Sequence, residues 1–195
     1  MWDERYSSDH YIYGTEPNQF LQQNVSRLGG KKILCLAEGE GRNAVWLARQ
    51  GYQVSAVDAS SVGQTKALKL AQQHKVSIHY EVRDLACFDL GIEQWDGIVS
   101  IFCHLPPALR KSLHQRIVHA LKPGGVLLLE AYTPRQLQLG TGGPQDAAMM
   151  MDAATLEAEL PGLRFDHLAE VKRDIVEGTG HTGCGAVVQV IATRR

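Results

Sequence analysis

The sequence lacks the segments that mark exported, membrane-spanning or nucleic-acid-binding proteins. It contains no run of about 18 apolar residues, and its first residues, MWDERYSSDHYIYG, include no apolar stretch of the signal-peptide kind. Apart from Arg194 and Arg195 it has no run of like charges, and a formal net charge of −1 leaves no electrostatic footprint for nucleic acid or an anionic membrane. We therefore expect a cytoplasmic protein, with a monomer favoured, whose partner is a small molecule.

Cysteine is also scarce and scattered. The four cysteines, Cys35, Cys87, Cys103 and Cys184, form no C-x-x-C pair. Such spacing indicates neither a zinc site nor a disulfide framework, and it fits a reducing compartment. We expect no metal site.

What the chain does contain is a regular alternation of strand and helix patterns. Its 195 residues suit one domain. Short apolar runs predict strands at 31–36, 52–58, 76–82, 95–105 and 126–132, and helical spacing predicts helices at 41–51, 59–74 and 106–125. Two further strands, 163–176 and 185–194, are joined by EGTGHTG and form a hairpin. The prediction is an α/β fold, a doubly wound Rossmann-like mixed sheet of seven strands with one antiparallel strand and helices on both faces.

Two segments depart from this alternation. Residues 1–30 form an expected N-terminal helical cap, in which Thr15 is the N-cap of a helix that ends at Gly29. Residues 133–151, TPRQLQLGTGGPQDAAMMM, are too long for a routine connection and are expected to form a lid. A smaller expectation concerns the helix at 59–74, where Ser61 and Gln64 suggest a capping box.

The loop AEGEG, residues 37–41, follows the first strand, where open α/β sheets bind their ligands. Gly39, Gly41 and Ala44 satisfy G-x-G-x-x-A, and Asp58 lies 19 residues after Gly39. This spacing is that of a dinucleotide-binding fingerprint. An NAD-dependent oxidoreductase is therefore one open interpretation.

Two glutamates in the loop favour a different ligand. Glu38 and Glu40 beside a pyrophosphate would repel it, at a cost of about 1 to 4 kcal/mol per charge pair near a protein surface. S-adenosylmethionine (SAM) has no phosphate, carries a sulfonium and an ammonium group, and has a ribose diol that suits a carboxylate. The acidic loop therefore favours SAM over NAD.

These features, with RDL after the third strand, WDGIVSIF in the fourth and LKPGG before the fifth, resemble class I SAM-dependent methyltransferases over nearly the full chain. The similar subgroup is that of small bacterial tellurite-resistance and thiopurine methyltransferases, which share a stretch like WDERY with YGTEPNQFL. The resemblance implies SAM as cofactor and S-adenosylhomocysteine (SAH) as product.

The same resemblance implies a set of cofactor-binding residues. Gly39 and Gly41 allow close approach of the amino-acid part of SAM, Asp58 followed by Ala59 binds the ribose, and Asp84 with Leu85 recognises adenine. The family's usual acid and first glycine are replaced here by Cys35 and Ala37. Glu38 or Glu40 is left to contact the ammonium group.

The acceptor side is predicted from the strand ends. His104 follows the fourth strand, Tyr132 ends the fifth, and Glu177 and His181 lie at the hairpin tip. We expect these four side chains to form the catalytic pocket, with His181 or His104 as a base or an orienting donor. The expected reaction is methyl transfer from SAM to a small molecule, with soft sulfur, selenium or tellurium nucleophiles among the candidates. A SAM-binding module without catalysis is the remaining alternative.

Overall fold

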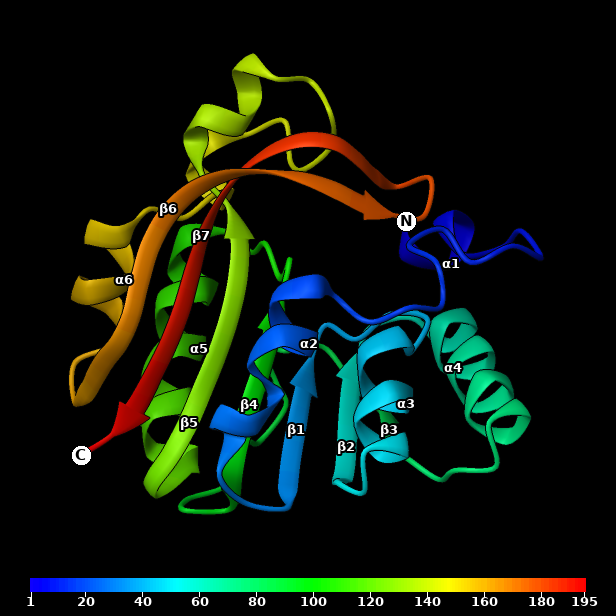
Figure 1. The fold of residues 1–195 in the computed structure, drawn as a ribbon, viewed down its shortest axis with the longest axis horizontal. Coiled ribbons are helices and arrows are strands. Elements are labelled where there is room, and N and C mark those ends of the chain that lie inside the picture. Colours follow the sequence, from blue (N-terminus) through cyan, green and yellow to red (C-terminus); the bar gives the residue numbers. More distant parts are fainter.

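A computed structural model describes all residues, 1–195, as one seven-stranded sheet in the order β3-β2-β1-β4-β5-β7-β6 (Figure 1). The strands are β1 Lys32–Leu36, β2 Gln53–Asp58, β3 His79–Val82, β4 Trp95–Ile101, β5 Leu121–Tyr132, β6 Leu163–Glu177 and β7 His181–Arg194. All neighbours pair in parallel except β7, which is antiparallel to both β5 and β6. The predicted fold class, including the single antiparallel strand, is confirmed.

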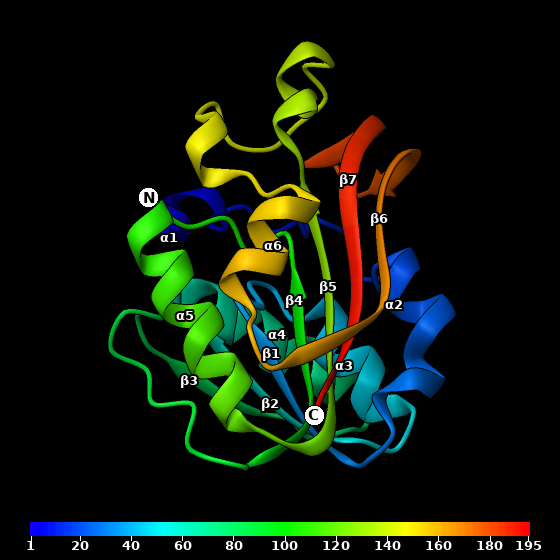
Figure 2. The ribbon, with the colours of Figure 1, turned by 90° about the vertical axis from the view of Figure 1, so that its left-hand side faces the viewer.

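Helices cover both faces of the sheet because consecutive strand residues point to opposite sides. The helices are α1 Trp2–Arg5, α2 Gln19–Asn24, α3 Arg42–Arg49, α4 Ser61–Gln73, α5 Pro107–Ala120 and α6 Ala153–Glu159, with short 3-10 turns η1 Val25–Leu28, η2 Pro134–Gln138 and η3 Ala147–Met149. In β1, Leu34 and Leu36 pack into the core below α5 and α6, while Ile33 and Cys35 pack below α2, α3 and α4. Figure 2 shows α5 and α6 on one side of β5 and β7, with α2 on the other.

Helix α2, the helix predicted within residues 15–29, begins later than predicted. Its N-cap is Asn18, whose side chain accepts a hydrogen bond from the N–H of Leu21, and Thr15 lies outside the helix. The capping box in α4 is also wrong, because Ser60 is the N-cap and accepts from the N–H of Gly63. The side chain of Gln64 instead donates to the carbonyl of Tyr80 at the end of the sheet.

The C-terminal hairpin is longer than predicted. Pairing between β6 and β7 continues to Glu177 and His181, so only residues 178–180 form the turn. Both residues are therefore strand residues, and both are buried, with 6% and 8% of their surface exposed. The hairpin brings this tip over the N-terminal segment, where the N–H of Gly180 donates to the carbonyl of Ile12 at 2.9 Å.

Candidate active site

A cavity of about 690 Å³ lies at the carboxyl ends of β1, β2 and β4, beside the point where strand order reverses between β1 and β4. This volume is in the range of small-molecule sites, roughly 300 to 1,000 Å³. Seven of the predicted site residues line it, namely Glu38, Asp58, Ala59, Asp84, Leu85, His104 and His181. Gly39, Glu40, Gly41, Tyr132 and Glu177 are not among its lining residues, and each has other contacts.

The two loop glycines occupy positions that exclude a side chain. Gly39 has φ +57°, and a Cβ atom there would lie 2.6 Å from the hydroxyl of Tyr6. Gly41 has φ +90°, and a Cβ atom there would lie 2.5 Å from that of Ala67 in α4. The glycines thus allow the loop to turn sharply under the N-terminal segment and against α4.

Asp58 connects this loop to the end of β2. One carboxylate oxygen accepts from the N–H of Gly39 and the other from the N–H of Ser60, both at 2.9 Å. Burial raises its pKa, while these backbone donors oppose the shift. Each oxygen has a second lone pair, so the carboxylate retains capacity for two donors such as a ribose diol.

Two non-glycine residues that line the cavity have left-handed backbone. Ala37 has φ +49° after β1, and Phe102 has φ +51° after β4. This region costs an L-residue roughly 1 to 2 kcal/mol, and such strain concentrates at ligand sites. At Phe102, the left-handed conformation accompanies a hydrogen bond from the backbone N–H to the carbonyl of Glu130, 2.8 Å away.

Glu38 is a second buried acid that lines the cavity. Its Oε1 accepts from the N–H of Ala44 at 2.7 Å, and burial raises its pKa to about 7. The thiol of Cys35 is fully buried next to it, and burial raises the thiol pKa well above its ordinary value. A buried carboxylate of this kind fits a cationic ligand group, since a positive charge would replace the solvation that the acid has lost.

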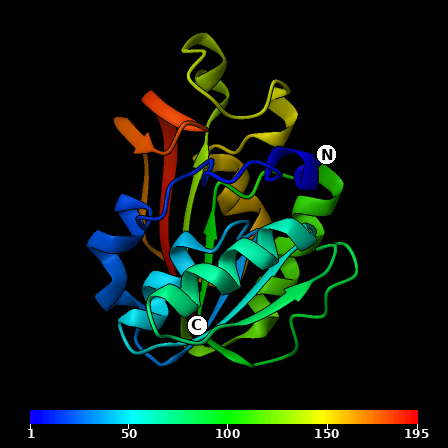
Figure 3. The same cartoon turned by 90° about the vertical axis from the view of Figure 1, so that its right-hand side faces the viewer.

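Glu40 is not among the cavity-lining residues and holds the N-terminal segment. Its Oε1 accepts from the N–H of Ile12 at 2.8 Å, and its other oxygen pairs with Lys66 of α4. The ammonium group of Lys66 also donates to the carbonyls of Tyr6, Ser8 and His10. Figure 3 shows the resulting path of the blue segment across the carboxyl ends of the strands.

At the other end of the cavity, Asp84 and Leu85 follow β3. The Oδ1 of Asp84 accepts from the N–H of Ala86 at 2.8 Å, which leaves Oδ2 without a protein donor. Asp84 is exposed and Leu85 is buried. An acid beside an apolar side chain can recognise the edge and the face of an adenine ring.

The side chain of His104 is hydrogen-bonded to the backbone of Tyr132. The N–H of Tyr132 donates to Nε2 of His104 at 3.0 Å, and burial lowers the pKa of His104 to about 4. The ring of Tyr132 is 1% exposed and stacks on Phe102 with centroids 4.7 Å apart. Because Nε2 already accepts a hydrogen bond, His104 is poorly suited to remove a proton from an acceptor.

His181 lies among aromatic rings. Its ring centroid is 4.5 Å from both Tyr13 and Phe102, and 5.3 Å from Tyr132. Burial, followed by the charge of Arg42, lowers its pKa to about 3. His181 is therefore neutral near pH 7, and its Nδ1 is buried without a hydrogen-bond partner.

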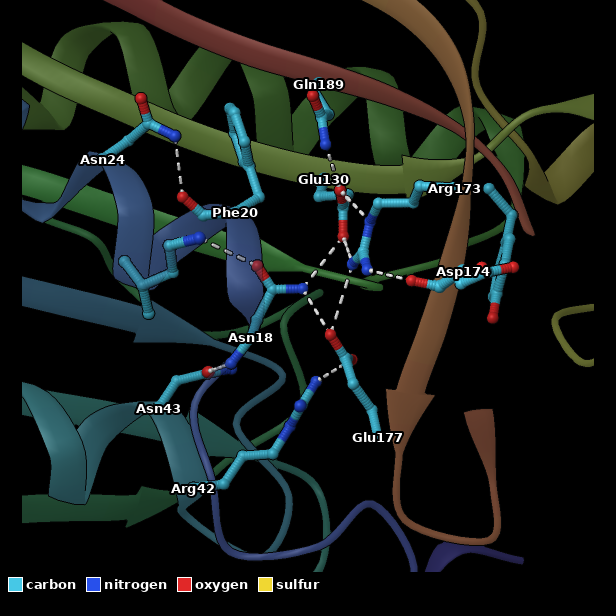
Figure 4. A network of polar contacts seen from close by, with 12 residues as sticks. Asn18, Phe20, Asn24, Arg42, Asn43, Glu130, Arg173, Asp174, Glu177 and Gln189 are labelled. Atoms are coloured by element: carbon cyan, nitrogen blue, oxygen red, sulfur yellow. Dashed lines mark hydrogen bonds and ion pairs between the residues drawn. The ribbon is translucent and has the colours of Figure 1, made fainter. Parts of the chain in front are cut away.

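Glu177 belongs to a buried polar network (Figure 4). Its Oε2 accepts from Arg42 at 2.6 Å, and its Oε1 accepts from Asn18 at 2.9 Å and Arg173 at 3.3 Å. Asn18 and Arg173 also donate to Glu130 of β5, which is fully buried. The network joins the N-terminal segment, α3, β5 and β6.

Arg42 and, apart from Glu177, its network partners are not among the residues predicted from the sequence. One signal was available, because an arginine in the first turn of a helix is opposed by the helix dipole and needs another reason to be there. Arg42 opens α3, lines the cavity and is only 7% exposed. The long-range partners Glu130, Arg173 and Asn18 had no comparable local signal.

Residues 33–125 match the protein family described as "Methyltransferase domain". In this part, just under half of its length, the chain is similar to methyltransferase domains. The match agrees with the predicted enzyme class and with SAM as the cofactor, and it argues against an NAD-dependent oxidoreductase.

Individual relatives agree with this assignment. A ubiquinone biosynthesis O-methyltransferase of Leptothrix cholodnii is 29% identical over 149 residues, covering 71% of this chain and 60% of that protein. The chain thus spans about three fifths of the length of this curated relative.

Solved structures share the fold. TehB from Haemophilus influenzae aligns with a TM-score of 0.74 at 16% identity, covering 100% of this chain and 66% of that one. A SAM-dependent methyltransferase from Methanosarcina mazei aligns with a TM-score of 0.68 at 18% identity, covering 92% and 98%.

Two features are absent from the structure. No group of three or more His, Cys, Asp and Glu side chains could hold a metal ion. None of the helices has the length and apolar character needed to traverse a bilayer.

Proposed function

We propose that the protein transfers the methyl group of SAM to a small-molecule acceptor that brings its own nucleophilic electron pair, such as a thiolate or a selenium or tellurium oxyanion. This choice rests on the weak basicity of the polar groups that we expect near the acceptor, namely His104, Glu177 and His181. His181 and His104 have pKa values lowered to about 3 and about 4, and Glu177 is held by two arginines. None is a strong base, whereas a hydroxyl acceptor would need one.

The cofactor end fits SAM by its charges. We assign the ammonium group to Glu38, the ribose diol to Asp58 and the adenine to Asp84 and Leu85, which all line the cavity. Gly39, Glu40, Gly41 and Ala59 then shape the loops on which these groups are carried. When bound, SAM supplies an electrophilic methyl group whose departure leaves a neutral thioether, so the chain's own task is to orient the acceptor and exclude water.

Two segments would exclude that water. We propose that residues 1–30 form a cap, since Tyr6 and Tyr13 line the cavity and Lys66 donates to the backbone carbonyl of Tyr6. Residues 133–151 would act as a lid, since Gly143, Pro144 and Gln145 line the same cavity.

The likeness to TehB supports, at the level of fold, our assignment to the tellurite-resistance and thiopurine methyltransferase subgroup.

The test is methyl transfer from isotopically labelled SAM to matched acceptors, namely thiols, selenols, phenols and tellurite. We expect thiols or the heavier analogues to be methylated and phenols to be inert. Methylation of phenols alone would overturn the choice of acceptor. Binding of SAM with no acceptor consumed would instead favour a binding module. His181→Gln should lower turnover while SAM affinity stays unchanged.

A further inference from the structure

Two buried polar atoms without hydrogen-bond partners belong to residues that line the cavity. They are Nη1 of Arg42 and Nδ1 of His181. Arg42 is 7% exposed and His181 is 8% exposed. Burying a polar group without a partner is costly, and buried polar groups in native proteins are nearly always satisfied.

Only one of the two terminal nitrogens of the Arg42 guanidinium has a hydrogen-bond partner. Its Nη2 donates to Glu177 at 2.6 Å, which fixes the guanidinium plane. Glu177 also accepts from Asn18 and Arg173, so its carboxylate is anchored on three sides. A planar guanidinium that is fixed through one nitrogen presents its remaining N–H groups in a defined direction.

This end of the cavity carries a positive charge that has no acidic partner. In the network, Glu130 and Glu177 balance Arg42 and Arg173, while Arg5 makes no ion pair and lies over the rings of Trp2 and Tyr13 at 5.4 and 5.6 Å. The other titratable groups here, Tyr13, His104 and His181, are neutral near pH 7. The acids that line the cavity lie after β1, β2 and β3, except Asp146, which caps η3.

We propose that the acceptor is a small, flat anion whose negative group binds Nη1 of Arg42 and whose body lies against the rings of Tyr13, Phe102 and His181. The proposal rests on the methyl transfer inferred above and names the charge of its acceptor. Nδ1 of His181 would then accept or donate one hydrogen bond at the edge of the same molecule.

The experiment compares benzoate with benzamide, which have the same shape and differ in charge. Binding of each to the SAH-loaded protein is measured by NMR titration. We expect benzoate to bind at least tenfold more tightly. In Arg42→Gln/Glu177→Gln, which removes the pair together, the ratio should fall to within twofold.

The control is Arg173→Gln/Glu130→Gln, which removes both ion pairs of Arg173 and leaves Arg42 bonded to Glu177. It should keep the wild-type ratio. Arg42→Lys keeps the charge and serves if the double variant fails to fold, and it should lower benzoate affinity at least fivefold.

Equal binding of the two probes to the wild type, or an unchanged ratio without Arg42, would overturn the inference. Equal loss in both double variants would do so too, since it would mark a structural role. Turnover is scored separately. Anion selectivity with no methylation of any acceptor would sink the proposed function alone, and thiol methylation without selectivity would sink this inference alone.

Discussion

The carboxylate of Asp58 accepts a hydrogen bond from the backbone N–H of Gly39 at 2.9 Å. One side chain at the end of β2 therefore fixes the loop after β1 and, in our assignment, binds the ribose. These two roles can be separated by experiment, because the first acts on stability and the second on affinity.

Asp58→Asn should weaken SAM binding by roughly 10- to 150-fold, since charge-assisted hydrogen bonds contribute about 1.5 to 3 kcal/mol. Calorimetric titration measures this. The control is Asp96→Asn at the opposite edge of the sheet, where Asp96 likewise accepts from the N–H groups of Lys31 and Lys32. That variant should lose stability and keep its SAM affinity. Equal affinity in both folded variants would show that Asp58 is only structural.

Glu38 should make SAM binding depend on pH. Its pKa in the free protein is raised to about 7 by burial, and a bound ammonium group would favour the ionised carboxylate. Binding below pH 7 must then release a proton, so affinity should rise as the pH rises, by roughly fivefold between pH 6 and 7. Titration in buffers of different ionisation enthalpy would detect the proton. Glu38→Gln should remove the dependence, and a flat wild-type profile would refute the assignment.

Ala37→Gly should stabilise the protein. The left-handed backbone at φ +49° costs alanine roughly 1 to 2 kcal/mol, which glycine avoids, while the greater freedom of unfolded glycine returns about 0.4 to 1 kcal/mol. The expected net gain of about 0.5 to 1 kcal/mol corresponds to roughly 1 to 4 °C in Tm. Ala108→Gly on the exposed face of α5 should show the opposite sign. A lower Tm for Ala37→Gly would contradict the strain argument.

Ala37 also illustrates what the sequence could predict. The strands, the glycine loop and Asp58 follow from local patterns of period and turn chemistry, and these placed the candidate cofactor residues at the carboxyl edge of the sheet, where the cavity lies. The substitution of alanine for the family's first glycine was visible in the sequence. Its positive φ was not, because that depends on the loop being held by Asp58 and α4.

The long-range polar contacts were harder to predict because they join distant segments. Glu40 pairs with Lys66, and Glu177 with Arg42, 135 positions away. Asn18 displaced Thr15 as N-cap because its backbone and side chain are also bound by Asn43, Glu130 and Glu177. No local pattern reports such partners, and charged residues in turns are normally solvated.

Lys66→Met should loosen the N-terminal cap. The ammonium group donates to three carbonyls of residues 6–10 and pairs with Glu40. Removing its charge would leave the carboxylate of Glu40 buried without an ion-pair partner. We expect faster hydrogen exchange in residues 1–14 and faster dissociation of SAH. Lys69→Met, on the exposed face of the same helix, is the matched control and should change neither. Unchanged exchange in Lys66→Met would mean that the cap is held by its other contacts.

Ligand binding should change the hydrogen exchange of the proposed lid, residues 133–151, only in its middle part. Both ends of residues 133–151 are anchored, because Gln136 accepts from the N–H of Ala186 at one end and Arg110 donates to the carbonyls of Ala148 and Met150 at the other. The anchoring arginine is itself fixed by buried Glu159. Between these anchors, residues 143–146 face the cavity and have few backbone hydrogen bonds.

Hydrogen exchange with and without SAH tests this arrangement. Residues 139–147 should gain protection when SAH binds, since closing over the ligand removes their amides from water, whereas residues 148–151 should be protected in both states. The loop at 89–94, away from the cavity, provides the internal control and should exchange equally in both. Arg110→Gln should release the second anchor and extend the ligand-dependent region to residue 151. Equal protection of 139–147 in both states would exclude a lid that closes on the cofactor.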